Sequence, residues 1–127
     1  MRLLLDSHAM IWYLQGDPTL SSTARQAIVD TRNHKFISAA SIWEVAIKVS
    51  IGKIQLKFPF ADFHQLLAIN QFDWLPISFE HAARVSRLPF HHRDPFDRII
   101  IAQALEERMT IVGLDPEFPA YGVPVLW

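Results

Sequence analysis

The sequence predicts a single α/β domain, residues 1–127, with a mainly parallel sheet of four or five strands covered by helices on both faces. Two observations lead to this fold class. Short runs that are apolar throughout, typical of strands buried on both sides, alternate with longer stretches of helical periodicity. The chain has 127 residues, 50% hydrophobic and 20% charged, which is the size and composition of one folded domain with its own apolar core.

The expected strands are short. The run from Leu3 to Leu5 is the clearest, because three consecutive leucines are followed at once by polar residues. Pro76 has no amide hydrogen to donate, so the strand that contains it is expected at the edge of the sheet. The five expected strands span residues 3–5, 36–38, 74–78, 110–112 and 123–126.

The expected helices are recognised by the residues at their ends. Gly16 and Gly52 are typical of helix C-terminal ends, and Ser78 of a cap. Asp94 followed by Pro95 opens the clearest helix. Helical patterns cover residues 11–14, 24–28, 39–51, 60–72, 79–88 and 96–108. Strands joined through helices run parallel, and ligand sites in such sheets form at the carboxyl ends of the strands.

Composition excludes several classes of protein. The absence of cysteine rules out a disulfide scaffold, a Cys-ligated zinc site and thiol catalysis. The 12 basic and 13 acidic residues give a net charge of −1, which argues against a broad basic surface but not against a local basic patch. No apolar run reaches the ~18–20 residues of a membrane span, and the first apolar run is too short for a signal peptide. We therefore expect a cytoplasmic protein that makes no membrane contact.

Acidic residues follow the predicted strands or lie on the helices that come next: Asp6, Glu44, Asp97 and Asp115. Each has an ordinary structural alternative. Asp6 suits a helix cap, and Asp115 suits a turn before proline. Glu44 suits a capping box with Ser41 or a surface pair with Lys48. A cap at Ser38 would instead place Glu44 one turn further in, facing the strand ends.

Carboxylates gathered in one crevice repel one another, and a hard divalent cation relieves that repulsion. Mg²⁺ suits such a site, and Mn²⁺ has similar preferences. A cation of this kind activates water and stabilises a phosphodiester transition state. Asp94 is a good N-cap and is explained by that role better than its neighbour Asp97 is.

A basic segment lies next to these acids. Its side chains are candidates to hold a nucleic-acid backbone, and a solvated surface is the alternative. They are Arg84, Arg87, His91, His92, Arg93 and Arg98. Adjacent histidines lack the usual spacing of a zinc pair, and Ser7 and His8 point apart in an extended chain. Neither a zinc site nor a serine nucleophile is therefore expected.

Three segments resemble PIN-domain proteins, most closely the VapC-type toxin ribonucleases of bacterial type II toxin–antitoxin modules. They are LLDSH (4–8), SAASIWEVAIK (38–48) and HHRDPFDRIIIAQA (91–104), and the third is long and specific. The similarity covers essentially the whole chain. It implies an α/β/α sandwich, Mg²⁺-dependent endoribonuclease activity, inhibition by a small antitoxin protein and commonly a homodimer.

The resemblance also assigns roles to residues. The catalytic acids of the family fall on Asp6, Glu44, Asp97 and Asp115, with Asp6 and Asp97 as the principal metal ligands. Ser7 and Asp94 would support that site. The expectation that Arg84, Arg87, Arg93 and Arg98 position RNA comes from their place beside the acids and not from the resemblance. Two departures stand out: Ser7 replaces the usual Thr, and Gly113 stands where a Thr often precedes the last acid.

Two other functions compete with this interpretation. A receiver-like signalling domain would also hold Mg²⁺ in an acidic pocket, but its acidic pair and its lysine after the last strand are not evident. A catalytically silent PIN fold that serves as a binding module is disfavoured by the intact acids.

The prediction of a homodimer rests on the resemblance and also on aromatic residues in excess of what one core absorbs, namely Trp12, Tyr13, Phe60 and Phe63.

Overall fold

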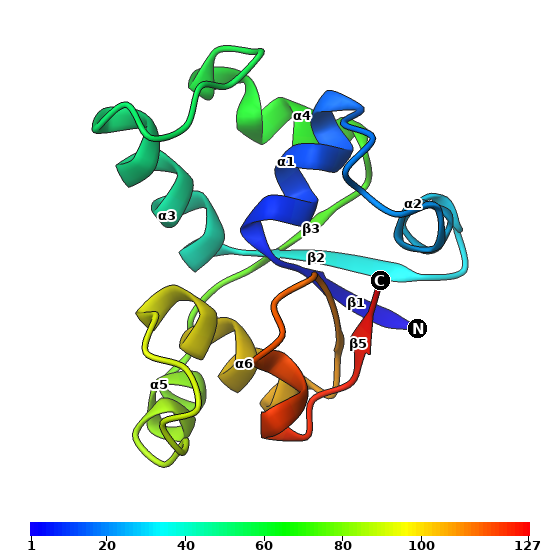
Figure 1. Ribbon diagram of the computed structural model, residues 1–127. Coiled ribbons are helices and arrows are strands. Elements are labelled where there is room, and N and C mark those ends of the chain that lie inside the picture. Colours follow the sequence, from blue (N-terminus) through cyan, green and yellow to red (C-terminus); the bar gives the residue numbers. More distant parts are fainter.

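A computed structural model describes residues 1–127 and contains a five-stranded sheet in the order β3-β2-β1-β4-β5, with every neighbouring pair parallel (Figure 1). The strands are β1 (Arg2–Leu5), β2 (His34–Ser38), β3 (Asp73–Leu75), β4 (Thr110–Val112) and β5 (Val125–Leu126). The helices are α1 (Ser7–Gln15), α2 (Ser22–Val29), α3 (Ala39–Ser50), α4 (Phe63–Ile69), α5 (Phe79–Val85) and α6 (Pro95–Glu107), with 3₁₀ turns at Phe60–Asp62 and Phe118–Tyr121. The predicted fold class is confirmed, and none of these helices is long and apolar enough to cross a membrane.

The sheet separates two apolar cores. Successive side chains of β1 point to opposite faces, so Leu3 and Leu5 join one core and Leu4 the other. The first core lies beneath α1, α2 and α4, and the second beneath α6, on the opposite face (Figure 1). Each fully buried leucine contributes about 1.5–3 kcal/mol of transfer free energy. The uniformly apolar run of β1 therefore follows from helices covering both faces.

Helix caps fix the start of the elements that carry polar residues. Ser38, not Ser41, caps α3, because its hydroxyl accepts the amide hydrogen of Ala40 at 3.0 Å. Glu44 therefore lies in the second turn, and the capping box with Ser41 does not form. The Asp94 carboxylate accepts the amide hydrogens of Phe96 and Asp97 at 2.8 and 3.3 Å, as expected of an N-cap.

Several elements are shorter than their sequence patterns indicated, and two of them have a clear physical reason. The predicted helix over 60–72 divides into a 3₁₀ turn and α4, which ends at Ile69. Gln71 then adopts a left-handed φ of 61°, a conformation that ends a helix. The strand expected over 74–78 stops at Leu75, directly before Pro76, and lies at the sheet edge as predicted.

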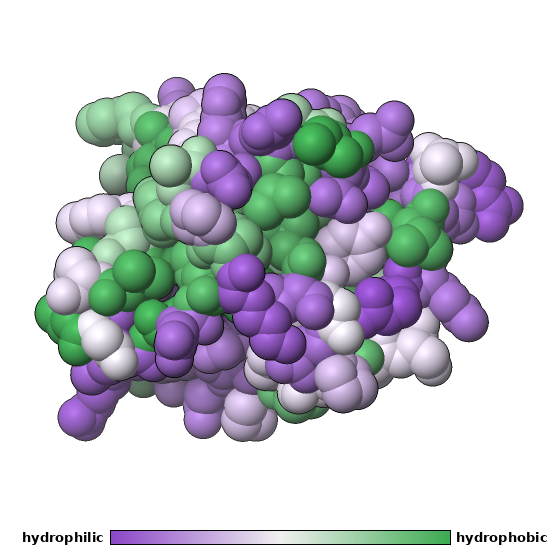
Figure 2. Space-filling model, turned by 90° about the horizontal axis from the view of Figure 1, so that it is seen from above, coloured by the Kyte–Doolittle hydropathy of each residue, from purple (hydrophilic) through white to green (hydrophobic).

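The four aromatic residues expected at a dimer interface are covered to different degrees: one is buried, two are half-buried and Phe60 is exposed. Phe63 is buried, Tyr13 packs edge-on against Phe72, and Trp12 packs against Trp127. Apolar surface remains on and just after α3, in the 3₁₀ turn before α4 and at the end of α4, at Trp43, Ile47, Ile51, Phe60 and Ile69. The view from above in Figure 2 shows green apolar surface between hydrophilic regions. The homodimer itself stays a prediction.

Candidate active site

An acidic cleft of about 280 Å³ opens at the carboxyl ends of β1 and β4. Asp6 follows β1, Asp115 follows β4, and Glu44 comes from α3, which begins directly after β2. Asp94 and Asp97 come from the start of α6. The lining residues are Asp6, Ser7, His8, Trp12, Glu44, Lys48, Asp94, Asp97, Leu114, Asp115 and Pro116. The structure thus brings all four predicted catalytic acids and both predicted supporting residues to one cleft.

Asp6 is held at the floor of the cleft. Its Oδ1 accepts the amide hydrogen of Ala9 at 2.8 Å, which caps α1 and fixes the carboxylate. Burial, which the hydrogen bond to Ala9 only partly offsets, raises the pKa of Asp6 to about 6. A Cβ atom at Gly113 would lie 2.4 Å from Oδ2 of Asp6. Glycine at 113 therefore allows the Asp6 carboxylate to approach the end of β4.

Glu44 is held by two hydrogen-bond donors. The Ser7 hydroxyl donates to Oε1, and the Lys48 ammonium donates to Oε2 at 2.8 Å. Glu44 is only 5% exposed, so this pair lies inside the cleft wall and not on an open helix surface. Of the two structural alternatives for Glu44, the capping box with Ser41 is absent and the pair with Lys48 is present. This pair faces the cleft.

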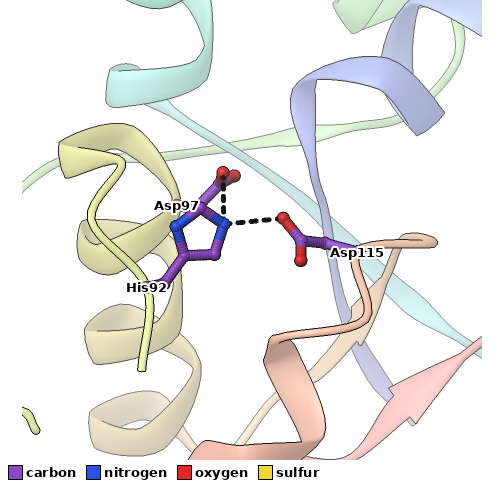
Figure 3. Close-up of side chains that lie close together, drawn as sticks. All are labelled: His92, Asp97 and Asp115. Atoms are coloured by element: carbon purple, nitrogen blue, oxygen red, sulfur yellow. Dashed lines mark hydrogen bonds and ion pairs between the residues drawn. The ribbon is translucent and has the colours of Figure 1, made fainter. Parts of the chain in front are cut away.

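His92 joins two of the acids (Figure 3). Its Nε2 lies 2.8 Å from Oδ2 of Asp115 and 3.2 Å from Oδ2 of Asp97. Its Nδ1 accepts the amide hydrogen of Asp94 at 3.0 Å, so in the neutral ring the proton lies on Nε2 and is donated to the carboxylates. Burial disfavours the charged ring, but the hydrogen bond to Asp115 and the neighbouring acids outweigh it and raise the pKa of His92.

The pKa of Asp97 is raised further than that of Asp6. Burial, followed by the negative charge of Asp94, raises the pKa of Asp97 to about 7, although His92 opposes the shift. Carboxyl groups with raised pKa values in one cleft mark a place where positive charge is lacking. Asp6 and Asp97 both have this property, whereas Lys48 already supplies a cation beside Glu44.

The four arginines that were predicted to position RNA do not line the cleft. Arg98 is 6% exposed, so its assignment as an RNA contact is wrong. Its guanidinium donates to the carbonyl oxygens of Val85, Leu88, Pro89 and His92 and lies 3.4 Å from the Tyr121 hydroxyl. Arg84 pairs with Glu106 at 2.6 Å and, with Arg87, lines a separate pocket. Arg93 is exposed and lines a third.

Sequence reasoning missed two residues of the site as members of it. The sequence patterns indicate Lys48 as a surface partner of Glu44, and His92 as a basic group near the helix start or as half of a disfavoured zinc pair. The i,i+4 spacing of Glu44 and Lys48 gave the signal for the first. His92 stands two residues before the N-cap, where a side chain can return to the helix start, but no spacing rule singles it out.

The donor set fits a hard divalent cation. Carboxylate oxygens dominate the cleft, and Mg²⁺ and Mn²⁺ prefer such ligands. The ligand atoms of His92, Asp97 and Asp115 lie within 4.8 Å of one another, a spacing that one ion can bridge. The Nε2 proton of His92 points at the carboxylates, so this nitrogen has no free lone pair for a metal ion. The aspartate oxygens are therefore better metal ligands than the imidazole in this arrangement.

Fold and site together define a PIN domain. The sequence profile of the PIN domain matches residues 3–124, and the chain belongs to that family. This membership excludes the receiver-like alternative.

Among curated proteins, the chain is 32% identical over 123 residues to ribonuclease VapC22 of Mycobacterium tuberculosis, covering 96% of this chain and 93% of that protein. Solved structures with the same fold include VapBC2 of Rickettsia felis bound to a promoter DNA fragment (TM-score 0.72, 15% identity, 98% of this chain and 97% of the other). A second is FitAcB of Neisseria gonorrhoeae (TM-score 0.65, 19% identity, 97% and 95%). A third is VapBC-1 of nontypeable Haemophilus influenzae (TM-score 0.67, 13% identity, 98% and 96%).

Proposed function

We propose that the protein is a metal-dependent endoribonuclease, and that it acts as the toxin of a type II toxin–antitoxin pair. The observation that carries the proposal is the cleft in which five carboxylates meet and two of them, Asp6 and Asp97, have raised pKa values. Membership of the PIN family, whose domains are typically nucleases, and the relationship to a VapC ribonuclease support it.

The side chains of the cleft have separate tasks in this proposal. A bound Mg²⁺ or Mn²⁺ ion would supply an activated water and stabilise the charge that develops on an RNA phosphodiester. Asp6 and Asp97 offer oxygen ligands, and Asp115 offers another from the turn after β4. Glu44, oriented by Ser7 and Lys48, faces the same space and would orient the attacking water.

Asp94 holds the start of α6 and thereby the position of Asp97. Its Oδ1 accepts the backbone amide hydrogen of Asp97, so the cap and the proposed ligand are linked directly. Its negative charge also contributes to the raised pKa of Asp97. Asp94 therefore supports the site without having to bind the ion itself.

A small antitoxin is the proposed protein partner. Three of the structural neighbours are toxin–antitoxin complexes by name, VapBC or FitAB, and this chain matches each over at least 97% of its length. Trp43, Ile47 and Ile51 recur every four residues and expose apolar surface along and just beyond α3, next to the acidic cleft wall that carries Glu44. An antitoxin that covers this side and inserts a basic residue among the carboxylates would inhibit the enzyme.

The proposal is tested with purified protein and structured RNA. We expect cleavage with Mg²⁺ or Mn²⁺, no cleavage in excess EDTA, and none with the Asp6→Asn/Asp97→Asn double variant. Cleavage that persists in EDTA or in the double variant would contradict the mechanism. Failure of the wild type to cut total cellular RNA under any divalent metal would favour a catalytically silent PIN domain.

A further inference from the structure

Lys48 is the only lysine or arginine that lines the acidic cleft. Its ammonium donates to Oε2 of Glu44 at 2.8 Å, and this is the one hydrogen bond that it makes. The side chain of Lys48 is 31% exposed, whereas that of Glu44 is 6% exposed, so the charged end of Lys48 lies at the mouth of the cleft above the glutamate. Two of its three N–H groups remain directed at solvent or at a ligand.

Both oxygens of Glu44 already accept a hydrogen bond, Oε1 from the Ser7 hydroxyl and Oε2 from Lys48. The ammonium of Lys48 also balances the negative charge of this carboxylate. A divalent ion on the remaining lone pairs of Glu44 would lie close to the Lys48 ammonium and be repelled by it. On the other side of the cleft, Oδ2 of Asp6 and Oδ1 of Asp97 accept no hydrogen bond, so these carboxylates keep free oxygens.

We propose that Lys48 is a built-in cation of the active site, which restricts the cleft to one divalent ion on the Asp6 and Asp97 side and binds the RNA phosphate that this ion does not reach. The inference rests on the proposed ribonuclease function and names the substrate contact that the four arginines do not supply. In a phosphodiester-cleaving site with two ions, the second ion stabilises charge on the phosphate oxygens. A lysine held against Glu44 performs the same electrostatic task with a fixed charge.

The surroundings of Lys48 support a permanent charge at this position. Its hydrogen bond to Glu44, and the more distant charges of Asp94 and Asp97 on α6, raise its pKa. An ordinary exposed i,i+4 pair would not have acidic groups of a second helix facing it. The ammonium of Lys48, on α3, is therefore attracted both to Glu44 and to the acidic groups at the start of α6.

The first test counts Mn²⁺ ions per chain by electron paramagnetic resonance, which needs no RNA and no activity. We expect one Mn²⁺ in the wild type and in Lys48→Arg, which keeps the charge. We expect a second Mn²⁺ in Lys48→Met, because that variant removes the positive charge beside Oε2 of Glu44. Lys53→Met, an exposed lysine outside the cleft, is the matched control and should bind one. Two ions in the wild type, or an unchanged count in a folded Lys48→Met variant, would overturn the inference.

The second test measures kcat/KM for RNA cleavage as a function of salt concentration. Loss of one phosphate contact should reduce the slope of log kcat/KM against log salt by about 0.7–0.9. We expect this reduction in Lys48→Met but not in Lys48→Arg or Lys53→Met. An unchanged slope in Lys48→Met would refute the phosphate contact. If the wild type cleaves no RNA, the proposed function fails, while the Mn²⁺ count still decides the role of Lys48.

Discussion

The two walls of the acidic cleft balance their negative charge in different ways. On the α3 wall, Glu44 is paired with Lys48 and receives a hydrogen bond from Ser7. On the opposite side, Asp6 and Asp97 lack a basic partner of comparable strength, and burial raises their pKa values to about 6 and 7. The difference separates the carboxylate that the fold has already paired with a cation from those that, in the proposed mechanism, would bind a cation from solution.

The largest effect should come from replacing a carboxylate on the unbalanced side. Asp97→Asn removes a proposed ligand and should lower Mn²⁺ affinity by about 10²-fold or more, with RNA cleavage at background. Glu44→Gln changes a residue that supports the site without being a principal ligand. It should lower Mn²⁺ affinity by about 10-fold, the low end of the range for residues that hold metal ligands in place. Calorimetric titration of both variants measures the contrast, and equal losses would show that the two walls are equivalent.

Arg98→Ala should strongly destabilise the protein because the loop before α6 depends on this side chain. The buried guanidinium donates to carbonyl oxygens of Val85, Pro89 and His92, among others. Leaving these acceptors unpaired should cost about 2–4 kcal/mol in the free energy of unfolding. Arg93→Ala, at an exposed position nearby, should change it by less than about 0.5 kcal/mol. Urea denaturation compares the two variants. A small loss in the free energy of unfolding for Arg98→Ala would show that Arg98 is not needed to hold this loop.

The pH dependence of stability should differ with and without metal. A carboxyl group whose folded-state pKa is raised, like that of Asp97, stabilises the fold below its ordinary pKa of 3.8, and this contribution is lost as pH rises toward 7. The metal-free protein should therefore lose thermal stability between pH 5 and pH 8, and Mg²⁺ should restore it at the upper end.

Asp97→Asn serves as the control for this effect. Its melting temperature should vary less with pH, and at pH 8 without metal its free energy of unfolding should exceed that of the wild type by an amount on the order of 1 kcal/mol. A metal-free wild type that becomes more stable from pH 5 to pH 8 would contradict the raised pKa values.

The smallest of the expected effects concerns the cap of α6. Asp94→Ala should cost about 0.5–2 kcal/mol in stability, because the amide hydrogens of Phe96 and Asp97 lose their acceptor. Asp94→Asn keeps an acceptor oxygen and should cost less, while removing the charge that raises the pKa of Asp97. Thermal melts of both variants separate the cap from the charge. Equal losses in the two variants would show that the negative charge, and not the cap, is what matters.

The sequence predicted the parallel sheet and the gathering of the four acids, because both depend on local signals, while the catalytic role of these acids stays a prediction. The apolar run of Leu3 to Leu5 and the cap at Asp94 are visible without tertiary information. The burial of Arg98 was not predictable in this way, since its partners are carbonyl oxygens of a loop that periodicity does not describe. His92 likewise enters the site only because its loop folds back over the start of α6.

The most direct test of the unequal walls is the position of Mn²⁺ in crystals soaked in MnCl₂, located by its anomalous scattering. The account predicts one peak per chain, coordinated by Asp6 and Asp97, with Lys48 still bonded to Glu44. A peak coordinated by Glu44 with Lys48 displaced, or two peaks in the cleft, would contradict it.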